Sequence, residues 1–334
     1  VTTPRRQDEP AGPDGFDAVF RLLQSEFGID FTHYKPSTVT RRIERRLQLA
    51  RAQSLDEYVA RLNRERGELD ILYRDLLIGV TRFFRNEEAF ERLEKNILPD
   101  LFRRGPADSP VRALVAGCAT GEEAYSLAIV LHELSAQFGN RPVKIFASDV
   151  HRGSIELATR ATYEEESLRN VSPARLDRYF IQRGHTFQVV PELRQMIVFA
   201  PHNVIRDAPF TRVDLISCRN LLIYLQSSVQ QKVLSLFHFA LKRGGVLVLG
   251  PSETPGAFLD HFETIDRHWR VYRKYSDARV AVDARLTPHR AVSEPRIAPV
   301  PQLPFPRHSL SQLLATYDTL LDEHMPPGFL VTEK

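Results

Sequence analysis

A turn with the pattern G-x-A-x-G, formed by Gly117, Ala119 and Gly121, lies between an apolar run and a segment with helical spacing. Glycine lets a ligand approach the backbone closely and adopts positive φ without strain. Glu122 and Glu123 follow at the start of the expected helix, where two acids suit the helix dipole but repel a pyrophosphate. The pattern predicts a ligand that is positively charged and lacks phosphate, and S-adenosyl-L-methionine, with its sulfonium and ammonium groups, fits. The alternative is a strand-helix turn that binds no ligand.

The next apolar run, Val143 to Ala147, is followed by one serine and then by an acidic residue, Asp149. In nucleotide-binding α/β folds, an acid at the tip of the second strand holds the ribose hydroxyls of a nucleoside. We therefore predict that Asp149 binds the ribose of the ligand. Its alternative role is to cap the helix expected at residues 154–160.

Two asparagines follow later apolar runs. Asn203 comes after the run that ends near Val198, and Asn220 comes just after the run Val213 to Cys218. Asn220 can hydrogen-bond the edge of a ligand, and Tyr224 is expected one helical turn later on the same face.

The segment at residues 78–85, IGVTRFFR, combines two phenylalanines with a threonine and two arginines. Its periodicity favours the end of a helix. One phenylalanine is expected to point into the core, while Thr81 and Arg85, four residues apart, face a pocket together. No Cx₂C, HExxH, GxSxG or Walker pattern occurs, so we expect no metal site and no nucleophilic triad.

The elements that must position these residues alternate between apolar runs and helical patterns, which predicts an α/β fold of Rossmann type. A small β hairpin and then a third strand are expected within Phe180 to Val198, and a C-terminal hairpin on the sheet edge within Thr264 to Tyr275. A helix is expected from Ser227 to Lys242, followed by a strand at Val246 to Leu249.

The domain organisation follows from composition and periodicity. We expect a flexible leader at residues 1–15, an all-helical domain at 16–104 and the α/β domain at 105–275, with its small β insertion at about 180–198. A proline-rich linker is expected at 276–307, and a helix with the start of a further domain at 308–334.

The second helix of the helical domain, from Pro36 to about Ala52, separates its faces sharply. Arg41, Arg42, Arg45 and Arg46 fall on one side, away from the apolar residues. Arginine favours carboxylate or phosphate partners, so this face predicts a docking surface for an acidic partner. The alternative is a solvated basic face.

The composition bounds the remaining possibilities. With 334 residues, of which 43% are hydrophobic, the chain can form one large core and a smaller domain. The net charge of +3 does not call for nucleic acid, and no apolar run is long enough to span a bilayer, so no membrane insertion is expected. Two cysteines indicate a reducing compartment, and we expect a cytoplasmic protein.

Five separated motifs carry a resemblance to a known family: GVTRFFR, VAGCATGEEAYSLA, FASDV, CRNLLIYL and GGVLVLGPSE. In this order, over about Phe16 to Lys274, the chain resembles the chemotaxis receptor methyltransferase (CheR) family. The resemblance implies a helical domain followed by a methyltransferase domain, with S-adenosyl-L-methionine as the donor and S-adenosyl-L-homocysteine as its product. The acceptors would be receptor glutamates, which become glutamyl methyl esters.

The resemblance also implies site residues. The family's motifs place the donor site at Thr81, Arg85, Glu123, Asp149, Asn203 with Val204, and Asn220 with Leu221. From the residues themselves, Gly117 and Gly121 are expected to approach the donor, and Arg85 and Tyr224 to orient the acceptor. The family often has asparagine two residues before the threonine of TRFFR, where this chain has Gly79. The basic second helix matches the surface that is thought to meet the acidic methylation helices of chemoreceptors.

Two further expectations concern partners. Members that tether to the C-terminal pentapeptide of a receptor carry a glycine-rich turn in the small hairpin, whereas Arg183 to Thr186 is short with one glycine, so no tethering is expected. The final MPPGFLVTEK resembles the first strand of a PAS sensor domain, which indicates the core of a CheR-PAS type protein.

The acceptor class can also be argued from the residues. Glutamate is ionised near neutral pH and needs no strong base, whereas an amine must first lose a proton. Around CRNLLIYL the chain offers Arg219, Asn220 and Tyr224, and apart from Glu253 no acid until Asp260. This positive and neutral lining predicts a carboxylate acceptor. A module that binds the donor without turnover remains an alternative, and a nicotinamide oxidoreductase is disfavoured by the acids after Gly121.

Overall fold

The computed structural model describes residues 16–77, 79, 81–104, 106 and 108–277. The predicted leader, the helix at 308–334 with its PAS-like start, and all but the first two residues of the predicted linker lie outside these residues.

The N-terminal part of the chain is helical, as predicted. Its helices are α1 (Asp17–Phe27), α2 (Pro36–Leu49), α3 (Leu55–Arg64) and α4 (Arg66–Leu76). Gly28 ends α1 in the left-handed conformation, with φ of 71°. Ser54 caps α3 by accepting a hydrogen bond from the amide of Glu57, as its sequence pattern predicts.

Three short helical segments lead from this part into the α/β domain. They are α5 (Glu87–Arg92), a π-helical turn (Leu93–Ile97) and α6 (Pro99–Arg103).

A seven-stranded sheet forms the centre of the α/β part, in the order β6-β2-β1-β7-β8-β10-β9. The first five of these strands run parallel, and β10 is antiparallel to both of its neighbours. The strands are β1 (Val111–Ala116), β2 (Val143–Asp149), β6 (Ile197–Pro201), β7 (Val213–Cys218), β8 (Leu241–Leu249), β9 (Phe262–Asp266) and β10 (Val271–Lys274). The predicted C-terminal hairpin at the sheet edge is therefore confirmed.

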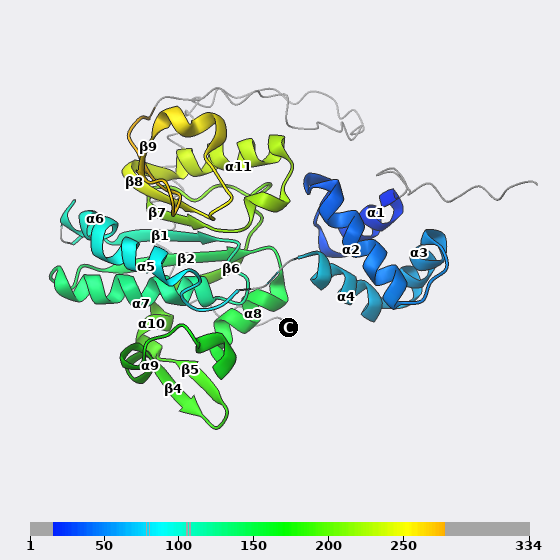
Figure 1. Cartoon of the computed structure of the whole chain (residues 1–334), viewed down its shortest axis with the longest axis horizontal. Coiled ribbons are helices and arrows are strands. Elements are labelled where there is room, and N and C mark those ends of the chain that lie inside the picture. Colours follow the sequence, from blue (N-terminus) through cyan, green and yellow to red (C-terminus); the bar gives the residue numbers. More distant parts are fainter. Residues whose placement is uncertain (1–15, 78, 80, 105, 107, 278–334) are drawn as a thin grey trace, which may run out of the picture. The chain divides into compact units, whose positions relative to one another are not determined.

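Helices cover both faces of this sheet (Figure 1). On β1, Ala113 and Val115 belong to a core shared with α7 (Glu122–Gln137), while Leu114 and Ala116 belong to a second core shared with α11 (Ser227–Ala240). Because both faces are buried, the strands are continuous apolar runs in the sequence. The helix α8 (Arg152–Arg160) follows β2.

One boundary differs from its prediction. The helix α11 ends at Ala240, and β8 begins at Leu241, so Lys242 lies in a strand and not in the helix. Leu241 pairs with Val213 of β7, and the Lys242 ammonium lies 2.9 Å from the carboxylate of Asp214. Pairing with β7 ends the helix earlier than periodicity suggests.

The small insertion has three strands and not two. The predicted hairpin is present as β4 (Phe180–Arg183) and β5 (Thr186–Val189), but β3 (Thr162–Glu164) pairs with the other side of β5. The helices α9 (Pro173–Tyr179) and α10 (Pro191–Gln195) flank the hairpin, and Ser172 caps α9 by accepting a hydrogen bond from the amide of Arg175.

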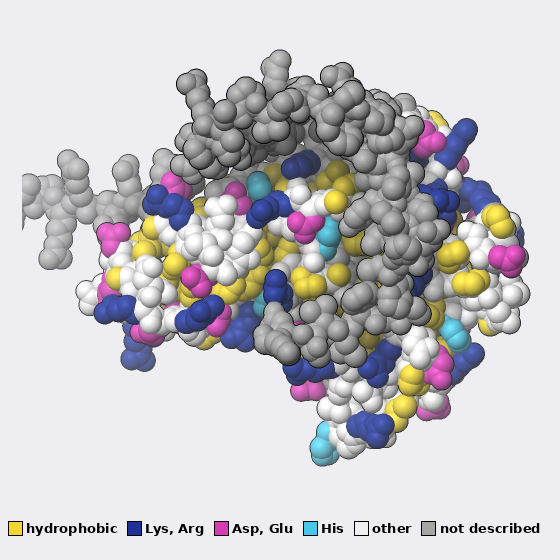
Figure 2. All heavy atoms as spheres, turned by 180° about the vertical axis from the view of Figure 1, so that it is seen from behind, with side chains coloured by type: hydrophobic (Ala, Val, Ile, Leu, Met, Phe, Trp, Pro, Cys, Tyr) yellow, Lys and Arg dark blue, Asp and Glu magenta, His cyan; other side chains and the backbone are white. Residues whose placement is uncertain are grey.

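The charged side chains are mixed on the surface. On the face drawn in Figure 2, Lys and Arg side chains of the described residues lie among Asp, Glu and hydrophobic ones. Within the described ranges, none of the helices has the length and apolar character needed to cross a membrane.

Candidate functional site

The site lies where the order of the parallel strands reverses. From β1 the chain proceeds through β2 to β6 on one side, and then returns to β7 on the other side of β1. In open α/β sheets, ligands bind in the crevice outside the carboxyl ends of the strands at this point. The glycine turn after β1 and the loops after β2 and β7 meet there.

The glycine turn has three residues in the left-handed region. Gly117, Ala119 and Gly121 have φ of 73°, 46° and 98°. The amides of Gly117 and Cys118 both donate to the carbonyl of Ser148, which fixes the turn to the end of β2. A side chain at Gly117 would lie 3.1 Å from Leu221, so glycine keeps the turn close to the loop after β7.

Gly121, which was predicted to approach the donor, faces another part of the molecule. It is the N-cap residue of α7 and is not among the residues that line either hollow of the site. A Cβ there would lie 2.8 Å from Ala158 and 2.9 Å from the hydroxyl of Tyr163. Packing against α8 and β3 therefore explains the glycine.

Asp149 is held by two backbone amides. One carboxylate oxygen accepts from His151 and the other from Ala119, each at 2.9 Å. The alternative role as a helix cap is wrong, because His151 is the N-cap residue of α8 and its ring accepts from the amide of Ser154. Burial raises the pKa of Asp149 above its ordinary value of 3.8, and the two amide hydrogen bonds oppose this rise.

Two adjoining hollows open at the carboxyl ends of the strands, and they share Gly117, Ala119, Asn220 and Tyr224. We call them the larger cavity and the polar recess. The larger cavity is lined by eighteen residues, among them four further predicted site residues, Asp149, Asn203, Val204 and Leu221. The polar recess also includes three predicted site residues, Thr81, Arg85 and Glu123. All predicted donor-site residues except Gly121 therefore line one hollow or both.

The polar recess contains a buried ion pair that the sequence did not predict. The guanidinium of Arg219, 5% exposed, lies 2.8 Å from the carboxylate of Glu123. Its second nitrogen donates to the carbonyl of Arg85 and to the side chain of Asn86, at 2.8 and 2.9 Å. Ser217 donates to the other oxygen of Glu123. The expected positive and neutral lining is therefore wrong in one respect, since it includes a carboxylate, which Arg219 neutralises.

The TRFFR segment is not the end of a helix. The helix α4 ends at Leu76, and Thr81 to Arg85 form a turn in which Phe84 has φ of 46°. Both phenylalanines are buried, although only one was expected to be, and the amide of Phe84 donates to the hydroxyl of Ser126 on α7 at 2.8 Å. Thr81 and Arg85 both lie on the wall of the recess, as expected, although not through the helical spacing on which that expectation rested.

The loop after β7 is fixed by Glu253, a residue of the GPSE motif that was not predicted as part of the site. Its buried carboxylate accepts from the amides of Asn220, Ile223 and Gly250, at 3.0, 3.2 and 2.6 Å. A Cβ at Gly250 would lie 2.7 Å from this carboxylate. Burial raises the pKa of Glu253, and the amide hydrogen bonds oppose this.

The helical part of the chain also contributes to the larger cavity. Tyr34, Leu76 and Leu77 line it, and none of them was predicted as a site residue. The amide of Lys35 donates to the carbonyl of Tyr224 at 2.8 Å, which joins the start of α2 to the loop that carries the predicted catalytic tyrosine. Tyr34 lies between α1 and α2 in a segment without periodicity, so the sequence carried no signal for it.

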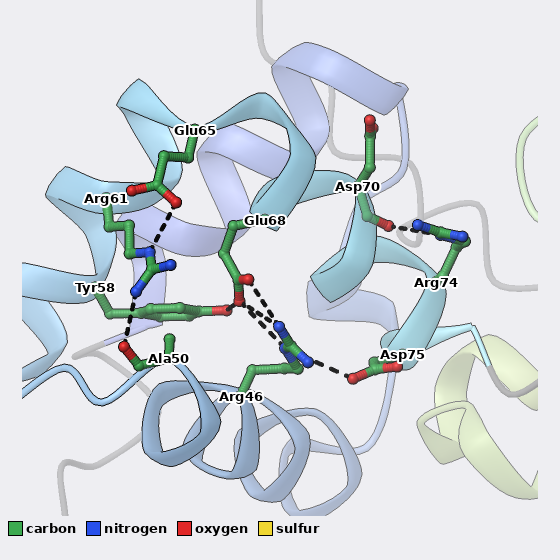
Figure 3. A network of polar contacts seen from close by, with 9 residues as sticks. All are labelled: Arg46, Ala50, Tyr58, Arg61, Glu65, Glu68, Asp70, Arg74 and Asp75. Carbon is green, nitrogen blue, oxygen red and sulfur yellow. Dashed lines mark hydrogen bonds and ion pairs between the residues drawn. The ribbon is translucent and has the colours of Figure 1, made fainter.

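The four arginines of α2 do not form one exposed face. Arg46 points to α4, where its guanidinium lies 2.7 Å from the carboxylate of Glu68 and 3.8 Å from that of Asp75 (Figure 3). Tyr58 also donates to Glu68, and Arg42 donates to the carbonyl of Asp75. Arg41 and Arg45 are exposed. The predicted docking set of four is therefore reduced to two exposed arginines.

The residues present fit S-adenosylmethionine. Asn220 lines both hollows, and its Oδ1 is buried without a hydrogen-bond partner among the described residues. Such an acceptor is costly unless a ligand donates to it. Within the described part of the chain, no group of three or more His, Cys, Asp or Glu is arranged to hold a metal ion.

Comparison with known proteins identifies the class and then the family. Residues 79–271 match the CheR methyltransferase SAM-binding domain, and residues 14–77 match the CheR methyltransferase all-alpha domain. The α/β part is thus an S-adenosylmethionine-binding methyltransferase domain. The chain belongs to the CheR methyltransferase family, and S-adenosyl-L-methionine is its cofactor.

Two relatives with chemotaxis methyltransferase names agree with this assignment. A chemotaxis protein methyltransferase of Listeria innocua is 31% identical over 233 residues, which cover 70% of this chain and 87% of that protein. Chemotaxis protein methyltransferase 2 of Pseudomonas aeruginosa is 35% identical, with 72% of this chain and 86% of that protein covered. An uncharacterized 104.1 kDa protein of Rhodobacter capsulatus is 38% identical over 79% of this chain, which spans only 28% of that relative.

Proposed function

We propose that this chain is a protein-glutamate O-methyltransferase that acts on chemoreceptors in chemotaxis-type signal transduction. The observation that carries the proposal is the polar recess of a CheR methyltransferase domain, where the methyl end of the donor and the acceptor carboxylate would meet. Among the lining residues of the recess, the one carboxylate, Glu123, is already neutralised by Arg219. The relatives named chemotaxis protein methyltransferase support the signalling role.

A neutralised carboxylate favours a carboxylate acceptor over an amine. An amine is mostly protonated at neutral pH and needs a base or a set of carboxylates to release its proton. Glu123 is engaged by both Arg219 and Ser217 and is poorly placed to act as that base. A glutamate side chain needs no deprotonation, so positioning suffices.

The chain's contribution to the reaction is orientation and exclusion of water. The cofactor supplies a methyl group on a sulfonium sulfur, so that a bond from the carboxylate oxygen to the methyl carbon forms as the sulfur–methyl bond breaks, with its electron pair left on sulfur. Arg85 and Tyr224, which line the recess, would hold the acceptor carboxylate in line with that bond. Because opposite charges neutralise each other in this step, a partly dry recess favours it.

The docking surface is proposed on Arg41 and Arg45, the exposed arginines of α2. Their charge suits the acidic methylation helices of a receptor. We do not expect the receptor's C-terminal pentapeptide to bind, because the turn between β4 and β5 is short. The two cysteines are buried and unpaired, which supports a cytoplasmic location.

Product chemistry tests the proposal. Receptor fragments are incubated with the chain and donor labelled in its methyl group, and the labelled product is treated with mild alkali. A glutamyl methyl ester releases volatile methanol, whereas N-methyl groups stay on the protein. Retention of the label would exclude a carboxylate acceptor. Binding of the donor without any transfer would favour the alternative, a module that binds the donor without turnover.

A further inference from the structure

The small three-stranded sheet contacts two of the loops that form the polar recess, the glycine turn and the TRFFR loop. Its strand β3 carries Tyr163, which is 7% exposed and lies between the glycine turn and the TRFFR loop. These two loops lie far apart in sequence, and a side chain that contacts both can fix their relative position.

The contact with the glycine turn is a hydrogen bond. The hydroxyl of Tyr163 donates to the carbonyl of Thr120 at 2.8 Å, and it leaves no room for a side chain at Gly121. Burial raises the pKa of the Tyr163 phenol well above its ordinary value of 10.0, so the hydroxyl keeps its proton at neutral pH. The next residues of the chain, Glu122 and Glu123, begin α7, and Glu123 lines the recess.

The contact with the TRFFR loop is aromatic. The ring of Phe83 meets Tyr163 edge to face at 4.8 Å and Phe180 of β4 at 5.3 Å between centroids. The amide of Phe83 also donates to the carbonyl of Ser167, just after β3. Phe83 therefore anchors the TRFFR loop to the small sheet at a point between Thr81 and Arg85, the residues of this loop that line the recess.

We propose that Tyr163 is a positioning residue for the methyl donor, and that the small sheet braces two of the donor-site loops, the glycine turn and the TRFFR loop. Through Thr120 it holds the turn before Glu123, and through Phe83 it holds Thr81 and Arg85. The brace requires no peptide on the small sheet, so it gives the insertion a role that does not depend on tethering to a receptor.

A matched pair of tyrosines tests this inference. Tyr179 of α9 is also buried in the small insertion, and its hydroxyl hydrogen-bonds His132 at 3.1 Å, on another side of α7. Tyr163→Phe and Tyr179→Phe each remove one hydroxyl and keep the ring. Affinity for S-adenosylhomocysteine is measured by calorimetry, with thermal unfolding of each variant as a check on folding.

Tyr163→Phe should weaken S-adenosylhomocysteine binding by about threefold to tenfold, the effect of one hydrogen bond, and Tyr179→Phe by less than about twofold. In turnover the Tyr163 variant should raise the KM for the donor more than Tyr179→Phe does. Equal effects of the two variants, or unchanged affinity in Tyr163→Phe, would overturn the inference. Should Tyr163→Phe fail to fold, Phe83→Leu tests the brace from the other loop, with the same loss of affinity expected and unchanged affinity counting against it.

The inference rests on the proposed function only in the turnover measurement. A chain that binds S-adenosylhomocysteine but transfers no methyl group to receptors would refute the proposed function, and the difference between the two tyrosine variants would still decide the role of Tyr163. Amide hydrogen exchange adds a ligand-free measurement. Exchange at residues 118–123 should accelerate in Tyr163→Phe and not in Tyr179→Phe, and equal rates would contradict the brace.

Discussion

The donor site and the basic helix α2 both present charged side chains, but they hold them differently. At the carboxyl ends of the strands, Asp149 and Glu253 each accept hydrogen bonds from two or more backbone amides, and Glu123 is paired with a buried guanidinium. On α2, Arg46 is fixed by Glu68, while Arg41 and Arg45 are exposed.

This difference separates charged groups that fix the geometry of the ligand site from charged groups that act on association with a partner. A carboxylate held by amides is preorganised, so a change there acts on ligand affinity and on the shape of the site. An exposed arginine is screened by salt and acts on association with a charged partner. Arg46 belongs with the first group although it lies on the same helix as the second.

The largest expected effect is on the free energy of unfolding, and it distinguishes two neighbouring arginines of α2. Arg46→Met should lower the free energy of unfolding by about 3 kcal/mol, because Glu68, 8% exposed, would remain buried without its cationic partner. Arg45→Met, one residue earlier and exposed, should change it by less than about 0.5 kcal/mol. Urea unfolding measures both. Similar losses in the two variants would show that the ion pair in Figure 3 contributes little to stability.

The next effect concerns the donor site. Asp149→Ala should weaken S-adenosylhomocysteine binding by about 1 to 3 kcal/mol, the scale of lost hydrogen bonds to a charged group. Asp266→Ala is the control, because Asp266 also accepts two backbone amides, those of His268 and Trp269, but lies on β9 at the far edge of the sheet. Calorimetry on the folded variants measures both. Unchanged affinity in Asp149→Ala would remove Asp149 from the donor site.

Asp149 and its control Asp266 should also differ in how they affect the pH dependence of ligand affinity. The pKa of Asp149 is raised, so this carboxylate gains a proton, and loses an acceptor for the donor, as the pH falls through the raised value. Affinity for S-adenosylhomocysteine should therefore decrease on acidification in the natural chain and change less in Asp149→Ala. Asp266 should not contribute over this range, because its pKa is lowered by its amide hydrogen bonds and by Arg92.

The sheet and most of its loops could be predicted from the sequence because each strand is a local signal. Residues Val213 to Cys218 form a strand with the predicted bounds, since a strand that is buried on both faces is a continuous apolar run. Residues that end such strands meet at one edge, and the family resemblance assigned Asp149 and Asn220 to one site there. The three-residue strand β3 was missed because it exists only through pairing with β5.

The parts that could not be predicted depend on contacts between distant residues. Periodicity placed four arginines on one face of α2, but it carries no information about Glu68 and Asp75. These two residues bind Arg46 and Arg42. The pairing of Arg219 with Glu123, 96 residues apart, is of the same kind. Local pattern predicts where a charged residue lies along an element, whereas the fold decides which charge is already satisfied.

The smallest expected effect tests the two arginines that the fold leaves exposed. Arg41→Glu with Arg45→Glu should raise the KM for an acidic receptor fragment by about threefold to tenfold, as for exposed charges at the rim of an interface. Added salt should reduce the difference from the natural chain, and affinity for S-adenosylhomocysteine should stay the same.

Arg64→Glu with Arg66→Glu makes the same change in net charge on other helices of this part and should leave the KM nearer its natural value. A double reversal that includes Arg46 would confuse docking with unfolding, because that arginine is bound to Glu68. If Arg41 and Arg45 can be reversed without any change in receptor KM, α2 presents a solvated basic face and the receptor docks elsewhere.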